Sequence, residues 1–217
     1  MYSYYLMRYG WTLRIFLDIK WEAVTMVNRK FQYDPFYAKL SQGILPTRFF
    51  IHKYNKHESP LCLACKCEVE TNEHLFQCIC YSSWQKNFYT TIRNHCHQSQ
   101  TSDLFTGTLL TYIKSYCHGT DYMRKPSHHG VFTFQNNIGW KNFFRGQITS
   151  QFQSEYEKTA ASPTQHWTFH LLRKMWLACK ELWEIRNEFE HGMDGHSRLH
   201  SHRQRLFNEL EKVYNER

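Results

Sequence analysis

The chain has 217 residues, enough for one compact domain or for two small modules that share a core. Hydrophobic residues make up 41% of it and charged residues only 21%, so its composition excludes a wholly disordered chain. The formal net charge of +8 is concentrated at the front, where residues 1–60 hold nine Lys or Arg against four Asp or Glu, and such a surface suits a phosphate-bearing partner.

The first twenty residues are apolar, but they predict neither a membrane span nor a secretory leader. Arg8, Arg14, Asp18 and Lys20 interrupt them, and no small-residue cleavage site follows. No run in the chain approaches the roughly 18 apolar residues that cross a bilayer. We therefore expect no membrane partner and an intracellular location, with nucleus and cytoplasm both open.

Residues 1–58 are expected to form a basic helical segment. Apolar residues recur at helical spacing from Trp21 to Phe31, stop at Asp34-Pro35, and resume from Phe36 to Ile44. Aspartate followed by proline is typical of a break between helices. The sequence therefore predicts consecutive helices here, separated by a short break.

Five of the eight cysteines fall within nineteen residues: Cys62, Cys65, Cys67, Cys78 and Cys80. Without a secretory leader, such a cluster favours a metal site over disulfides. Cys62 and Cys65 form a CxxC knuckle, and His74 and Cys78 share one face if they lie on a helical turn. The resulting C-x2-C-x8-H-x3-C pattern predicts a tetrahedral zinc site. It would be structural, because four protein ligands leave no open position.

Two alternatives stay open within this cluster. Cys67 and Cys80 are rival ligands, and Cys80 could replace Cys78 as the fourth. The cluster could also consist of reduced, buried thiols beside a surface histidine. We expect Cys67 and Cys80 to be bystanders, because neither has the spacing of the other residues.

After the cluster, the sequence predicts a short helix and then an irregular connector. Trp84, Phe88 and Ile92 are four residues apart, which indicates an amphipathic helix to about residue 97 and completes a zinc-binding region at 59–97. Residues 98–135 contain three glycines, a proline and few charges. We expect an irregular connector there, with a surface loop at 115–132.

Residues 136–217 are expected to form a C-terminal helical bundle. The i+4 series Trp140, Phe144, Ile148 and Phe152 predicts one helix that ends near Ala161.

A long helix should follow, starting with Ser162 as the N-cap, Pro163 at the first helical position and Gln165 three residues after the cap. It should end at His191-Gly192. Its two adjacent apolar rows indicate two packing partners, although self-association is an alternative. One row is Leu171, Met175, Ala178, Leu182, Ile185 and Phe189, and the other is Leu172, Trp176, Cys179 and Trp183.

Three further expectations concern the end of the chain. Trp183 should be buried, and Arg186 should form an i,i+4 ion pair with Glu190. A final helix from about Ser197 should return as an antiparallel hairpin against the long helix. Together these elements predict a mainly α fold, a helical bundle with a small Cys3His zinc knuckle inserted between helical segments.

Residues 61–78, LCLACKCEVETNEHLFQC, resemble the zinc-binding tail of non-LTR retrotransposon reverse transcriptases, which has a CxxC, a Glu-Thr pair, a His-Leu-Phe and a last Cys. The flanks are similar to the same tail at residues 45–47 (LPT), 138–140 (IGW), 182–187 (LWEIRN) and 191–192 (HG). The resemblance covers nearly the whole chain from Trp21. It implies a zinc ion, binding of template RNA or target DNA, and a reverse transcriptase domain as a partner.

No enzymatic activity and no small-molecule substrate are expected. A polymerase or nuclease site needs clustered carboxylates, whereas this chain has no Asp-Asp pair and its aspartates are scattered singly. Contact with RNA or DNA is assigned to the basic segment before the knuckle. Its candidate residues are Arg48, His52, Lys53, Tyr54, Lys56 and His57. The alternative is a structural or protein-docking remnant without affinity for nucleic acid.

Overall fold

The computed structural model describes residues 2–120 and 130–191, together with residues 203, 204, 206, 207, 211 and 214. Over these residues the chain is helical and forms no strand, and two isolated bridges join Ile19 to Thr149 and Leu61 to Val69. The mainly α fold predicted from the sequence is confirmed. None of the described helices combines the length and the apolar character that crossing a bilayer requires.

The N-terminal region contains α1 (Tyr2–Tyr9), α2 (Leu13–Asp18), α3 (Trp21–Lys30), α4 (Pro35–Gln42) and α5 (Arg48–Tyr54). The predicted break at Asp34-Pro35 is present. The Asp34 carboxylate accepts a hydrogen bond from the Phe36 N–H at 2.9 Å, and Pro35 opens α4, where its missing N–H costs no hydrogen bond. α4 ends at Gly43, whose φ of 63° is strained for a residue with a Cβ.

The middle of the chain is more helical than its sequence suggested. It contains α6 (Asn72–Gln77), a 3-10 turn (Ile79–Tyr81), α7 (Ser82–Gln98), α8 (Asp103–Cys117) and α9 (Val131–Ile138). The expectation of an irregular connector over 98–135 is therefore wrong. Ser102 caps α8 by accepting the Phe105 N–H at 3.3 Å, and Phe105, Leu109 and Ile113 bury one face of that helix. Half of the expected surface loop at 115–132, residues 121–129, lies outside the described residues, and its two ends belong to α8 and α9.

The single helix expected from Trp140 to Ala161 is instead two helices, α10 (Trp140–Phe144) and α11 (Ser150–Thr159). They are separated at Gly146, whose φ is 94° and where an added Cβ would lie 2.9 Å from the Trp176 ring. The Gln135 side chain stabilises the break, because its amide donates to the Gln147 carbonyl at 3.2 Å and its carbonyl accepts from the Thr149 N–H at 3.0 Å. Tight packing on Trp176 thus interrupts the i+4 pattern.

The long helix, α12 (Trp167–His191), begins four residues after Pro163, its predicted first helical residue. Ser162 is exposed and lies outside the helix. The start is stabilised from α11 instead, because the side-chain oxygen Oε1 of Gln153 accepts hydrogen bonds from the Thr168 N–H and hydroxyl, both at 3.0 Å. A cap supplied by a distant residue leaves no local signal in the sequence.

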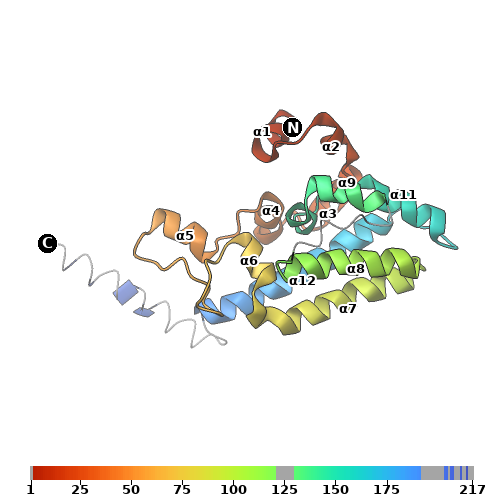
Figure 1. Ribbon diagram of the computed structural model, residues 1–217. Helices are drawn as coiled ribbons and strands as arrows, with labels where there is room; N and C mark the ends of the chain where they lie inside the picture. Colours follow the sequence, from red (N-terminus) through yellow and green to blue (C-terminus); the bar gives the residue numbers. More distant parts are fainter. Residues whose placement is uncertain are drawn as a thin grey trace.

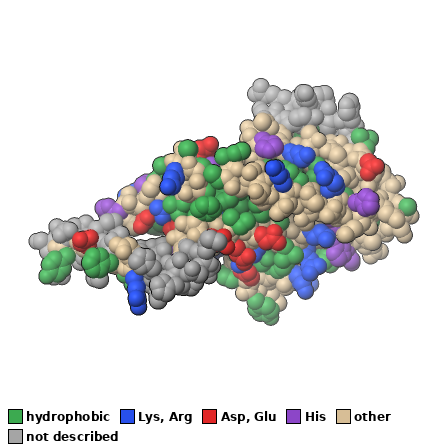
Figure 2. All heavy atoms as spheres, turned by 90° about the horizontal axis from the view of Figure 1, so that it is seen from below, with side chains coloured by type: hydrophobic (Ala, Val, Ile, Leu, Met, Phe, Trp, Pro, Cys, Tyr) green, Lys and Arg blue, Asp and Glu red, His purple; other side chains and the backbone are tan. Residues whose placement is uncertain are grey.

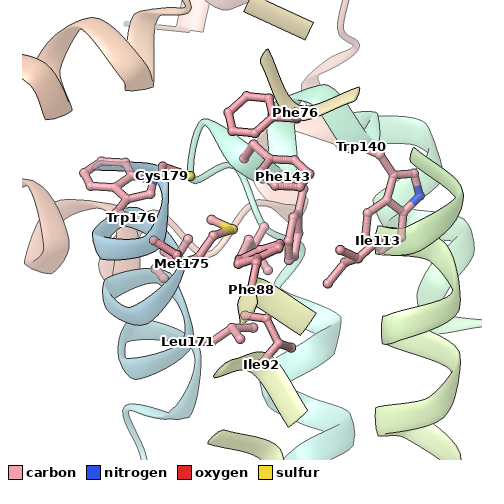
Figure 3. Close-up of a cluster of buried hydrophobic side chains, with 14 of the residues drawn as sticks. Phe76, Phe88, Ile92, Ile113, Trp140, Phe143, Leu171, Met175, Trp176 and Cys179 are labelled. Atoms are coloured by element: carbon pink, nitrogen blue, oxygen red, sulfur yellow. The ribbon is translucent and has the colours of Figure 1, made fainter. Parts of the chain in front are cut away.

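Both apolar rows of α12 are used within the chain, on α7 from one side and on α3 and α4 from another (Figure 1). Figure 3 shows Leu171, Met175, Trp176 and Cys179 in this core, near Phe88. The side chains of both rows become more exposed toward the C-terminal end of the helix. Trp183 is only partly buried, not buried as predicted, and Phe189 is 53% exposed. Most of the predicted final helix, residues 197–217, lies outside the described residues.

Leu182→Ala should lower the free energy of unfolding by about 2–5 kcal/mol, because it leaves a cavity between packed helices. Leu182 is 1% exposed, whereas Leu177 on the same helix is 39% exposed, so Leu177→Ala serves as the matched control and should cost well under half as much. Urea titration of both variants checks this. Equal losses would contradict the assignment of this face of α12 to the core.

Candidate metal centre

The four predicted ligands, Cys62, Cys65, His74 and Cys78, lie together at one end of the bundle. Their donor atoms are all within 4.8 Å of one another. The Sγ atoms of Cys62 and Cys78 are 3.9 Å apart, and the Cys65 Sγ lies 3.4 Å from the His74 Nε2. Apart from Cys65, which is half-buried, these side chains are buried. The predicted Cys3His cluster is confirmed as a group that can hold a metal ion.

The first two ligands are presented by a tight turn. The Lys66 N–H donates to the Cys62 carbonyl at 2.8 Å, and Lys66 adopts a left-handed φ of 58°. The Cys62 N–H in turn donates to the Glu68 carbonyl at 2.8 Å, beside the bridge between Leu61 and Val69. The turn directs both cysteine sulfurs to the same side, as a CxxC knuckle requires.

The other two ligands are presented by α6. Thr71 caps this short helix by accepting the His74 N–H at 3.0 Å, and the Cys78 N–H closes it by donating to the His74 carbonyl at 2.8 Å. The Nδ1 of His74 lies 3.2 Å from a Glu68 carboxylate oxygen. A carboxylate on Nδ1 fixes the imidazole tautomer that leaves Nε2 free to bind a metal.

The rival cysteines lie outside the cluster. Cys67 is exposed and its Sγ donates to the Cys65 carbonyl at 3.0 Å, while Cys80 is exposed beyond the end of α6. Burial, together with the sulfurs of Cys62 and Cys65, raises the pKa of the Cys78 thiol above its ordinary value. A bound cation would reverse this effect by favouring the thiolate.

A buried ion pair joins the knuckle to α12. Glu70 has no solvent exposure, and Arg186 contacts both of its oxygens, with Nε at 3.1 Å and Nη2 at 2.8 Å. The Arg48 N–H also donates to Glu70, at 2.7 Å. Although burial opposes its charge, the bonds to Glu70 raise the pKa of Arg186. The sequence predicted only the pair with Glu190, which is present at 3.2 Å; the partner 116 residues away has no local signal.

Two of the residues predicted to contact nucleic acid instead contact other groups of the protein. The Arg48 guanidinium pairs with Glu190 at 3.0 Å and with Glu58 at 3.2 Å, and its side chain is only 12% exposed. The His52 Nδ1 lies 2.7 Å from the Glu58 carbonyl oxygen. Arg48 in particular offers little surface to a phosphate.

The remaining residues of that segment face solvent. Lys53, Lys56 and His57 are exposed, and Tyr54 is 80% exposed. The Lys53 ammonium lies 4.6 Å from the centre of the Phe49 ring, which holds it near the surface of α5. These groups are free to contact a partner.

Comparisons with protein-family models, with curated proteins and with solved structures give no match for this chain.

Purified protein should contain one metal ion per chain, held by Cys62, Cys65, His74 and Cys78. Cys78→Ser should abolish stoichiometric binding, because three donors cannot complete the tetrahedron. The matched controls Cys67→Ser and Cys80→Ser should keep the ion. Elemental analysis of the three variants checks this, and loss of metal from Cys80→Ser but not from Cys78→Ser would reassign the fourth ligand.

Arg186→Met should lower the free energy of unfolding by about 3–5 kcal/mol, because it leaves the Glu70 carboxylate buried without its main partner. The control is Lys180→Met, also on α12, which breaks a partly exposed pair with Asp34 at the start of α4 and should cost about 0–1 kcal/mol. Urea titration at saturating metal measures both. If the two variants lose the same stability, the buried pair does not hold the knuckle.

Proposed function

We propose that this chain is a non-catalytic, zinc-dependent nucleic-acid-binding module, as its resemblance to the tail of non-LTR reverse transcriptases implies. In this proposal zinc fixes the knuckle, and the knuckle positions the exposed part of the preceding basic segment against RNA or DNA. A reverse transcriptase domain is the partner beside which it would act.

The distances between donor atoms support zinc. Around a tetrahedral zinc ion with bonds of about 2.3 Å to sulfur and 2.0 Å to nitrogen, the sulfurs lie about 3.8 Å apart and sulfur and nitrogen about 3.5 Å apart. The corresponding distances here are 3.9 Å for Cys62 to Cys78 and 3.4 Å for Cys65 to His74. Three thiolates and an imidazole are also a donor set that suits zinc better than magnesium or calcium. When bound, the ion would act as a structural cross-link.

The proposal rests mainly on which charged side chains around the knuckle are paired within the protein and which are not. Every acidic residue between positions 48 and 74 contacts a cation or a histidine of the chain itself: Glu58 pairs with Arg48, Glu68 with His74, Glu70 with Arg186 and Glu73 with Arg145.

By contrast, Lys53, Lys56 and Lys66 are exposed and have no carboxylate partner in the described part of the chain. The exposed Glu68 faces His74, so the charged side chains of this segment that lack a salt-bridge partner among the described residues are the three lysines. Exposed, unpaired cations are what binding to phosphates requires.

Exposed aromatic rings on α5 favour single strands. Tyr54 projects beside Phe50, with ring centres 5.4 Å apart, and Phe49 is 39% exposed. Unpaired bases stack on such rings, whereas the bases of a duplex are already stacked. Lysines 53 and 56 flank this aromatic position, so one strand could be contacted through both bases and phosphates.

A second candidate function is docking of another protein. Ile79 is 74% exposed and Phe189 is 53% exposed, and Leu61 and Val69 of the knuckle are also partly in contact with solvent. Exposed apolar side chains near a rigid knuckle suit a protein partner. This candidate predicts no affinity for nucleic acid at low salt.

The triple variant Lys53→Gln, Lys56→Gln, Lys66→Gln should weaken binding to single strands. It should also lower the slope of log affinity against log salt by roughly two units, because each phosphate contact with a single strand releases about 0.7 of a counterion and three contacts are removed. Tyr54→Ala should weaken the binding of single strands by about 1–3 kcal/mol, because one stacking ring is lost. Fluorescence anisotropy across a salt series measures both effects.

The matched control is Arg29→Gln, Lys30→Gln, Lys39→Gln, which removes the same charge from exposed positions on α3 and α4. It should change the slope much less. Equal slopes for the knuckle variant and the unaltered protein would contradict this interface, and absence of binding at low salt would favour protein docking.

A further inference from the structure

α7 carries positive charge and no negative charge. Its 17 residues include Lys86, Arg93, His95 and His97, but no Asp or Glu. Lys86, Arg93 and His97 are exposed, and their spacings of seven and four residues place them on one side of the helix. They span about 16 Å along the axis at 1.5 Å per residue. None of them is needed for the knuckle or for the metal.

The helices on either side of α7 extend this charge. On α8, Lys114 lies 5.6 Å from the centre of the Tyr89 ring of α7. On α12, no acidic residue occurs before Glu181, and His170, Arg173 and Lys174 precede it. Figure 2 shows basic side chains gathered at the wide end of the molecule, with most of the acidic ones nearer its middle.

The positive groups of α12 lie close to α7. The Trp84 indole N–H of α7 donates to the Ala178 carbonyl of α12 at 2.7 Å, which fixes the two helices against each other. His95 of α7 is buried between them, and burial together with the charges of Lys174 and His170 lowers its pKa to about 4. Lys174 of α12 therefore lies near α7, and we group the cations of the two helices as one positive surface at the wide end of the molecule.

We name this surface the α7 face and define it by Lys86, Arg93, Lys114, Arg173 and Lys174. None of these cations has a carboxylate partner in the parts of the chain that the structure describes. Like-charged groups without compensation repel one another, so a polyanion that binds them is favoured by both attraction and relief of that repulsion.

The chemistry of the α7 face distinguishes it from the knuckle. All three large aromatic residues of α7 (Trp84, Phe88 and Tyr89) are buried, and its outer positions hold Asn87, Thr90 and Asn94 between the cations. Hydroxyl, amide and cationic groups contact phosphates and sugars but offer no ring for base stacking.

A membrane surface fits less well than a nucleic acid. A helix that lies in a bilayer interface buries its apolar side in lipid, whereas the apolar side of α7 is already buried in the protein core.

We propose that the α7 face binds the phosphate backbone of a nucleic-acid duplex, as a second contact surface distinct from the α5 and knuckle segment. The inference goes beyond the proposed function, which concerns single strands at the α5 and knuckle segment. With both surfaces in use, the chain would engage a junction between a single strand and a duplex.

The test compares a 20-base-pair duplex with a single strand of the same sequence. The variant Lys86→Gln, Arg93→Gln, Lys174→Gln should weaken duplex binding about tenfold or more near 0.1 M salt and lower its salt slope by roughly two to three units. Its affinity for the single strand should change less than about threefold. The charge-retaining variant Lys86→Arg, Arg93→Lys, Lys174→Arg should bind as the unaltered protein does, and melting curves confirm that both variants are folded.

Three outcomes would overturn the inference: unchanged duplex affinity in the Gln variant, equal losses for duplex and single strand, or binding to phosphatidylserine vesicles that depends on these cations without duplex binding. The knuckle variant, Lys53→Gln, Lys56→Gln, Lys66→Gln, keeps this test separate from the proposed function. If the knuckle variant loses single-strand binding but keeps duplex binding, both proposals are supported. If only the α7 variant weakens binding, and only to duplex, the second surface stands and the knuckle interface fails.

Discussion

A fully buried carboxylate, that of Glu70, meets the guanidinium of Arg186 at 2.8 Å and 3.1 Å across 116 residues of sequence. Neither charge is tolerated alone in such a place, because the cost of removing it from water is offset only by its partner and its other hydrogen bonds. The knuckle must therefore sit where Glu70 reaches α12. The same contact fixes the start of α5 through the Arg48 N–H, so metal centre, basic segment and bundle share one constraint.

This constraint also determines which charges face outward. Glu70, Glu58 and Glu190 are paired within the protein with Arg186 and Arg48, while Lys53, Lys56 and Lys66 remain exposed without a carboxylate partner in the described part of the chain. A sum of charges along the sequence does not reveal this separation. The three unpaired lysines are available to phosphates, whereas Arg48 is part of the framework rather than of the surface.

The sequence predicted the metal cluster and the core of α12 because both depend on local spacing: CxxC, His74 and Cys78 four residues apart, and two rows of apolar residues. It did not predict α8, because the glycine and threonines of this segment indicated a loop, although Phe105, Leu109 and Ile113 have helical spacing. It also misplaced the break at Gly146 and the start of α12, because these depend on Trp176 and on the Gln153 side chain, which come from other helices. Contacts of that kind, like the pair between Glu70 and Arg186, have no signature in a single sequence.

The central claim is that the metal and the pair of Glu70 with Arg186 hold the knuckle, α5 and the end of α12 as one unit. Hydrogen–deuterium exchange with and without a zinc chelator tests it most directly. On this account, removal of the metal should speed exchange in residues 47–78 and in the last turns of α12 together, while α7 and the middle of α12 stay protected. Faster exchange confined to the CxxC turn, with the amides of Phe49 and Glu70 still protected, would contradict it.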